Sequence, residues 1–133
     1  MDAVRLIEEA YEAKKYSYAP YSGFHVGAAL LTEDGRIFRG CNIENAAYSP
    51  TNCAERTAFF KAVSEGALGF TAIAIAGDRE EYLAPCGVCR QVMAEFCDVH
   101  SFRVILAKSK QEYQIVTLKE LLPRAFSGKD LRG

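Results

Sequence analysis

The stretch TAIAIAG at residues 71–77 constrains the fold most, because it is short and almost entirely apolar. A strand without a polar face is typical of a sheet that is covered on both faces. Around this stretch, segments with helical periodicity alternate with other short apolar segments. We therefore predict one α/β domain over residues 1–133, with three layers in the order α/β/α and a mixed central sheet of about five strands.

The limits of the expected elements follow from periodicity and from the residues that break it. A hairpin signal, EDG at 33–35, joins the first two strands, Gly66 follows the second helix, and Pro123 ends the last one. The final stretch, SGKDLRG, is expected to be a loose tail. The sequence thus predicts helices over 2–18, 53–65, 85–97 and 118–123, and strands over 24–32, 36–43, 71–77, 102–107 and 113–117.

The charge balance argues against a nucleic-acid partner. Lysine and arginine number 16, aspartate and glutamate number 17, and the net charge is -1 with no basic run. Proteins that grip nucleic-acid backbones normally carry an excess of basic residues, so a small-molecule substrate is expected. The N-terminal segment lacks the apolar core of a signal peptide, and no apolar run approaches the ~18 residues of a membrane span. We therefore expect a cytoplasmic protein without a membrane partner.

Three of the five cysteines have the spacing of a catalytic zinc site. Cys86 and Cys89 form a C-x-x-C pair at an expected helix start, and Cys53 adds a third thiol from another helix start. Three protein ligands leave the fourth tetrahedral position open. A closed structural site, with Cys41 or Cys97 as the fourth ligand, and a redox dithiol remain alternatives.

Glu55 has two interpretations. With Asn52 it forms the pattern of a helix capping box, which would make it structural. It also lies two residues after Cys53, where a carboxylate can carry a proton for a metal-activated water. Three thiolates on Zn²⁺ would leave a net negative charge, so Arg56 is expected to donate hydrogen bonds to the thiolates and tune the metal.

Longer motifs carry a family resemblance. CAER at 53–56 and PCGVCRQ at 85–91 resemble the zinc signature of the cytidine deaminase family. YAPYSGFHVGAALLTEDGRIFRGCNIENAAY and LLPRAF extend the resemblance over about residues 11–127. The sequence is most similar to the short members, which form homotetramers and bind zinc through three cysteines.

The resemblance implies a role for each matching residue. Cys53, Cys86 and Cys89 would bind one zinc ion per subunit, and Glu55 would be the proton shuttle. The substrate would be held by Phe24 against the pyrimidine, by Asn42 and Glu44 on the ribose hydroxyls, and by backbone groups of Ala54. Tyr48, Phe126 and part of segment 126–133 would reach a neighbouring subunit, so that active sites are shared.

The implied reaction is hydrolytic deamination of cytidine and 2′-deoxycytidine to uridine and 2′-deoxyuridine, with attack of a zinc-activated water at C4 and release of ammonia. Its implied place is pyrimidine salvage. Two alternatives remain: deamination of another cytosine nucleoside, such as an antibiotic, and a zinc-stabilised binding protein without catalysis.

Overall fold

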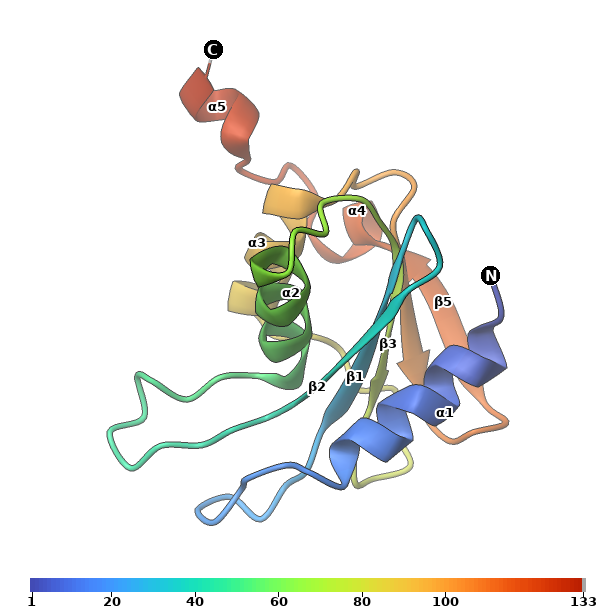
Figure 1. Ribbon diagram of the computed structural model, residues 1–133, viewed down its shortest axis with the longest axis vertical. Coiled ribbons are helices and arrows are strands. Elements are labelled where there is room, and N and C mark those ends of the chain that lie inside the picture. The colour runs from blue at the N-terminus through green and yellow to red at the C-terminus, as the bar shows by residue number, and fades with distance from the viewer. Residues whose placement is uncertain (133) are drawn as a thin grey trace.

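A computed structural model describes residues 1–132 as a five-stranded sheet flanked by helices (Figure 1). In chain order, the elements are α1 (Ala3–Lys14), β1 (Gly27–Thr32), β2 (Ile37–Cys41), α2 (Ala54–Ser64), β3 (Phe70–Ala76), α3 (Gly87–Phe96), β4 (Arg103–Ala107), β5 (Tyr113–Thr117), α4 (Leu118–Leu121) and α5 (Gly128–Arg132). Within this described range, no helix is both long and apolar enough to cross a membrane.

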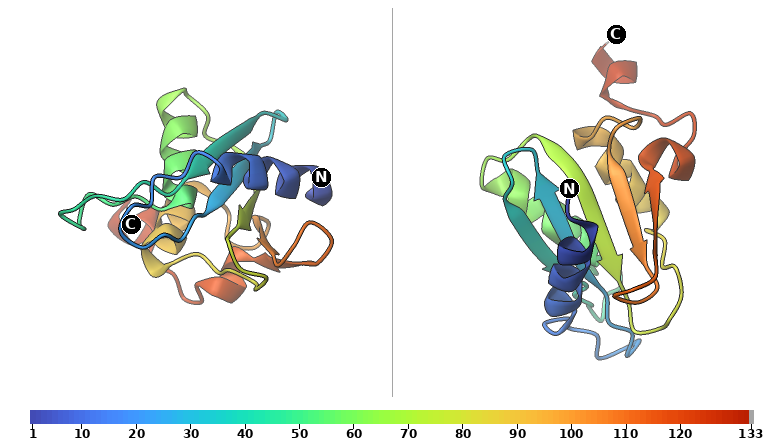
Figure 2. Two further views of the ribbon diagram at one scale, coloured as in Figure 1. Left: turned by 90° about the horizontal axis from the view of Figure 1, so that it is seen from below. Right: turned by 90° about the vertical axis from the view of Figure 1, so that its right-hand side faces the viewer.

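The sheet is mixed and is covered on both faces. Its strand order is β2-β1-β3-β4-β5, in which β3 and β4 are parallel and the other neighbours are antiparallel. Helix α1 crosses one face, whereas α2 and α3 lie against the other, as Figures 1 and 2 show from three directions. The predicted three-layer α/β/α architecture is therefore confirmed.

Strand β3 explains how the two faces differ. Its residues alternate between alanine and isoleucine, so that Ala72, Ala74 and Ala76 face α1 while Ile73 and Ile75 face α2 and α3. All five side chains are fully buried. Small side chains on one face allow α1 to lie close to the sheet, and the larger ones on the other face fill the wider layer beneath two helices.

The first helix and the first strand are shorter than the sequence predicts. Helix α1 ends at Lys14, and β1 begins only at Gly27. Residues 24–26 leave the sheet because side chains bind their backbone: Asn42 donates to the Phe24 carbonyl and accepts from the Val26 N–H, while the His25 N–H donates to Asp78. The segment before β1 therefore becomes a loop held by polar side chains.

The prediction of a loose tail is wrong over residues 128–132. This segment forms the short helix α5, which starts after Ser127 and is supported by a hydrogen bond from the Ser127 N–H to the Asp130 carboxylate. The helix buries no side chain and stands away from the rest of the chain in Figures 1 and 2. Local capping, which the sequence pattern did not reveal, is enough to shape it.

Two connections bring α2 and α3 to the same end of the sheet. Helix α2 packs across β2, and α3 is the crossover between the parallel strands β3 and β4. At the β2 crossing, Gly40 lets the helix approach: a Cβ atom there would lie 2.3 Å from the Ala54 carbonyl oxygen and 2.5 Å from the Ala58 nitrogen. The absence of a side chain at residue 40 thus sets the position of the first turn of α2.

We predict that Gly40→Ala destabilises the protein by roughly 1–3 kcal/mol, because backbone atoms of α2 must move to admit the methyl group. Denaturant unfolding would measure this. Gly87→Ala is the matched control, since a Cβ atom there would meet nothing within 4 Å and should change the stability by less than about 1 kcal/mol. Equal stabilities of the two variants would contradict the close approach at Gly40.

Candidate metal and substrate site

Three thiols meet where α2 and α3 begin. Cys53 is the N-cap residue of α2, Cys86 is the N-cap residue of α3, and Cys89 lies in the first turn of α3. The Cys53 and Cys86 sulfurs are 3.7 Å apart, those of Cys86 and Cys89 are 3.4 Å apart, and all three lie within 4.8 Å of one another. Segments that are separated by more than thirty residues therefore supply one compact sulfur cluster.

The cluster fits a zinc ion with one open position. Tetrahedral zinc with Zn–S bonds of about 2.3 Å requires sulfur atoms about 3.8 Å apart, close to the spacing of these thiols. Among residues 1–132, no further cysteine or histidine joins the group. The alternatives in which Cys41 or Cys97 completes a closed site are therefore wrong, and the protein leaves one coordination position for another molecule.

The surroundings of the thiols favour negative charge. Each helix N-terminus contributes a partial positive charge of about half a unit, and the Cys89 N–H donates to the Cys86 sulfur at 3.4 Å. Hydrogen bonds from Cys89 and Arg56 lower the pKa of Cys53 to about 5, although burial opposes the change. Because Cys89 donates its proton to Cys53, and because it is buried, the pKa of Cys89 is raised.

Arg56 supplies a full positive charge at the cluster. Its Nη2 atom donates to the Cys53 sulfur at 3.3 Å. Its Nε atom is buried and has no hydrogen-bond partner among the described residues. The side chain therefore lies where the sequence analysis expects it, directed at a thiol rather than at solvent, and what it does for the reaction stays a prediction.

Glu55 is buried in the first turn of α2 and does not cap it. Helix α2 begins at Ala54, Cys53 occupies the cap position without a side-chain cap bond, and the Asn52 amide donates to the Thr57 hydroxyl instead. The capping-box interpretation is therefore wrong. Glu55 is only 5% exposed, and burial, with a further contribution from the neighbouring Cys53 thiolate, raises its pKa to about 7.

A cavity of about 330 Å³ opens beside Glu55 and the thiols. Leu83 and Ala84, from the loop before α3, form part of its wall. That wall was not anticipated, although an apolar pair directly before Pro85 in a polar loop was a usable signal. The residues that line the cavity are Ser22, Phe24, Val26, Asn42, Glu44, Thr51, Asn52, Cys53, Ala54, Glu55, Leu83, Ala84 and Cys86.

Asn42 and Glu44 reach the cavity with most of their hydrogen-bonding capacity already used. The Asn42 oxygen accepts from the Val26 N–H and the Ser17 hydroxyl, and its amide donates once, to the Phe24 carbonyl. The Glu44 carboxylate accepts from two backbone N–H groups and from the Ser22 hydroxyl. These bonds, above all the one from Ser22, lower the pKa of Glu44.

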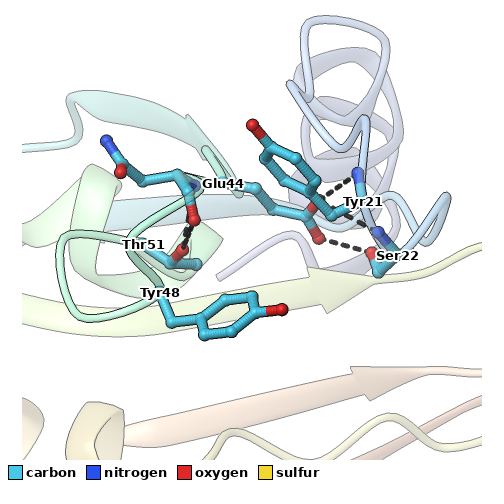
Figure 3. A pocket seen from close by; sticks show the side chains of 6 residues that line it. Tyr21, Ser22, Glu44, Tyr48 and Thr51 are labelled. Carbon is cyan, nitrogen blue, oxygen red and sulfur yellow. Dashed lines mark hydrogen bonds between the residues drawn. The ribbon is translucent and has the colours of Figure 1, made fainter.

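Tyr48 and Phe126 lie outside this cavity. A neighbouring hollow of about 430 Å³ is lined by Tyr48, Glu44, Ser22 and three further residues, Tyr21, Asn45 and Thr51. Figure 3 shows Glu44 bonded to the Tyr21–Ser22 turn, with Tyr48 across the hollow. Phe126 is 58% exposed, and only its carbonyl is bound, by the Gln91 amide. Neither aromatic ring lies over the thiols of its own chain.

Comparison with known proteins identifies the class to which this arrangement belongs. Residues 2–106 match the family model described as the cytidine and deoxycytidylate deaminase zinc-binding region. The match contains the three thiols and Glu55, and it spans most of the chain. The protein is thus a member of the cytidine and deoxycytidylate deaminase family, and the three cysteines are its zinc ligands.

Individual relatives narrow the class to the short members. A cytidine deaminase of Sporosarcina psychrophila is 56% identical over 131 residues, covering 98% of this chain and 96% of that protein. One of Halalkalibacterium halodurans is 52% identical, with 98% of each chain covered. The crystal structure of a cytidine deaminase from Burkholderia pseudomallei superposes with a TM-score of 0.89 at 47% identity, covering 95% of this chain and 100% of that one.

We predict that Cys86→Ser weakens zinc binding by more than about 100-fold, since even the loss of an outer partner of a ligand costs 10–100-fold. Competition with a zinc-sensitive chelator would measure this. Cys41→Ser should retain wild-type affinity, because Cys41 is outside the sulfur cluster. Loss of zinc from the Cys41 variant, or its retention by the Cys86 variant, would contradict the ligand assignment.

Proposed function

We propose that this protein deaminates cytidine and 2′-deoxycytidine by hydrolysis, giving uridine or 2′-deoxyuridine and ammonia, in pyrimidine salvage. The observation that carries the proposal is the burial of Glu55 in the same cavity as the Cys53 and Cys86 thiols. A carboxyl group beside a zinc-binding cluster is what a deaminase needs to move protons. The relatives that are similar over nearly the full chain are cytidine deaminases, which supports the same reaction.

Glu55 would serve as the single proton carrier. Bound zinc supplies Lewis-acid activation of a water molecule. Glu55 takes a proton from that water and passes it to N3 of cytosine as oxygen adds to C4. It then transfers a second proton to the departing amino group, so that ammonia leaves and the C4 carbonyl forms. With burial raising its pKa to about 7, the Glu55 carboxyl can both accept and return a proton.

The free hydrogen-bonding capacity of Asn42 and Glu44 suits one sugar hydroxyl. An amide nitrogen has two N–H groups, and Asn42 uses one of them. A carboxylate can accept about four hydrogen bonds, and Glu44 accepts three. A hydroxyl that donates to Glu44 and accepts from Asn42 satisfies both. One such contact leaves the other ribose hydroxyl unread, which supports the use of both ribonucleosides and deoxyribonucleosides.

Two further residues complete the proposed roles. Phe24 offers its ring to the pyrimidine from the cavity wall, and backbone groups of the buried Ala54 lie beside Glu55 to bind the base. Arg56 offsets the negative charge of three thiolates and so helps the activated water to lose its proton. Its hydrogen bond to Cys53 supports this role.

The protein would act as a homotetramer with shared active sites. Tyr48 is 79% exposed and Phe126 is 58% exposed, a large exposure for aromatic side chains beside a substrate cavity. Both are free to reach the cavity of a neighbouring subunit, together with segment 126–133. Three zinc-binding thiols must also stay reduced, which supports a cytoplasmic location.

Two other functions remain to be separated from this one. A deaminase of a nucleoside antibiotic would keep Glu55 but prefer a substituted cytosine nucleoside to cytidine. A zinc-stabilised binding protein would bind a nucleoside without turning it over and would not depend on Glu55. The burial of an ionisable carboxyl group in the cavity favours catalysis, because burying such a group without a use costs stability.

We predict that Glu55→Gln lowers the turnover of cytidine by at least 100-fold to about 10,000-fold, because glutamine cannot carry a proton. The absorbance change from cytidine to uridine measures the rate. Zinc content and the unfolding midpoint should stay near wild type. Glu65→Gln, at the exposed end of the same helix, is the control and should be fully active. Equal rates for Glu55→Gln and wild type would remove Glu55 from the mechanism, whereas an inactive wild type would favour the binding protein.

We predict that cytidine and 2′-deoxycytidine have kcat/KM values within about tenfold of each other, and that 2′,3′-dideoxycytidine is worse by about 100-fold or more, since it leaves Asn42 and Glu44 unpaired. CMP should also be a poor substrate, because the ionised Glu44 repels a phosphate. Steady-state kinetics with the four compounds would test this. CMP turnover equal to that of cytidine would refute the assigned role of Glu44.

A further inference from the structure

A hydrogen-bonded cluster around Asp78 lies next to the substrate cavity. One oxygen of Asp78 accepts from the His25 backbone N–H at 2.6 Å and from His25 Nδ1 at 2.8 Å. The other oxygen pairs with Lys14 Nζ at 3.2 Å, and Lys14 also donates to the Gly77 carbonyl at 3.2 Å. Asp78 thus joins the end of α1, the loop before β1 and the end of β3.

The residues joined by Asp78 are chain neighbours of the cavity walls. His25 lies between Phe24 and Val26, which both line the cavity. Asp78 opens the loop that carries Leu83 and Ala84, the opposite part of the lining. The bonds between His25 and Asp78 therefore tie the segment of one wall to the segment of the other.

The two walls also meet directly above Gly77. A Cβ atom on Gly77 would lie 2.9 Å from Leu83 Cδ2 and 3.2 Å from Phe24 Cζ, so both side chains pack on the bare backbone there. The guanidinium of Arg79 lies 5.0 Å from the centre of the Phe24 ring, within the range of a cation–π contact. Phe24 is thus held by groups on both sides of Asp78 in the chain.

Asp78 itself does not line the cavity. Its side chain is 31% exposed and belongs to neither buried core, and α1 is fixed to the sheet by its own apolar residues Leu6, Ile7 and Ala10. The fold therefore does not depend on this carboxylate. Its bonds instead fix the relative position of two loops that carry substrate-facing residues.

We propose that Asp78 is a positioning residue of the nucleoside site, which holds the Phe24 wall and the Leu83–Ala84 wall at the separation that a pyrimidine nucleoside requires. The inference rests on the proposed function. Without Asp78 the walls populate other separations, and the binding-competent fraction falls. The apparent affinity falls by the same factor, while the chemistry on α2 and α3 proceeds at its normal rate once the substrate is bound.

The experiment compares Asp78→Asn and His25→Ala with wild type in the zinc-loaded protein. Asn cannot neutralise Lys14 and directs an amide N–H at one of the donors, whereas His25→Ala removes the ring bond and keeps the backbone bond. We expect KM for cytidine to rise about tenfold in Asp78→Asn and less in His25→Ala, with kcat within about threefold of wild type. The double variant should be no worse than Asp78→Asn, because both changes break one network.

Asp34→Asn is the matched control. Asp34 also accepts hydrogen bonds from a neighbouring side chain and from an arginine, but it lies in the β1–β2 turn at the opposite end of β1. Its KM and kcat should equal those of wild type. Calorimetric titration with the product uridine gives a second measure, since its dissociation constant should rise with KM in the Asp78 variant. Zinc content should be unchanged in every variant.

Several results would overturn the inference. An unchanged KM for Asp78→Asn, with or without a lower melting temperature, would show a structural role at most. A fall in kcat at constant KM would place the effect in the chemical step. If Asp78→Asn does not fold, His25→Ala decides the question by the same split between KM and kcat. An inactive wild-type enzyme would instead contradict the proposed function, which distinguishes the two failures.

Discussion

The meeting of two helix N-termini at three thiols is the constraint on which the rest of the structure depends. Zinc-binding thiolates and a carboxylate repel one another, and only a positive field makes their proximity tolerable. Cys53 and Cys86 are both N-cap residues, so each sulfur lies at the positive end of a helix. Arg56 adds a full charge at 3.3 Å. The fold serves this geometry: Gly40 admits the first turn of α2 against β2, and the crossover between β3 and β4 brings α3 to the same end of the sheet.

Chemistry and recognition are carried by different kinds of structure. The thiols, Glu55 and Arg56 lie on the first turns of two helices that are packed against the sheet, where small shifts are costly. The groups proposed to hold the nucleoside lie on loops, and polar side chains rather than core packing fix those loops. Asn42 binds the backbone on both sides of residue 25, and Glu44 binds the Tyr21–Ser22 turn. Each therefore shapes the cavity as well as facing it, which leaves each only a small remaining capacity for a ligand.

Patterns that arise from burial were predictable from the sequence, and patterns that arise from polar side chains were not. The alternation in TAIAIA predicted a strand with two covered faces, and the spacing of Cys53, Cys86 and Cys89 predicted the zinc site. The late start of β1 was missed because Asn42 and Asp78, distant in sequence, capture the backbone of residues 24–26. Glu55 was ambiguous because a helix start permits both a cap and a proton carrier. Only the observed N-cap at Cys53 and the burial of the carboxyl group separated the two.

The protonation of Glu55 links the site's electrostatics to its proposed reaction. Burial and the Cys53 thiolate raise the pKa of the carboxyl, whereas the Arg56 cation lowers it, and the balance lies at about 7. A carboxylate with an ordinary pKa would give up its proton too readily to protonate a leaving amine, and one raised much further would rarely be free to accept a proton from water. Arg56 therefore acts on both partners of the reaction, since the charge that stabilises the Cys53 thiolate also limits the rise of the Glu55 pKa. The walls that exclude solvent from Glu55 matter for the same reason, because a looser cavity would hydrate the carboxylate and return its pKa toward that of an exposed glutamate.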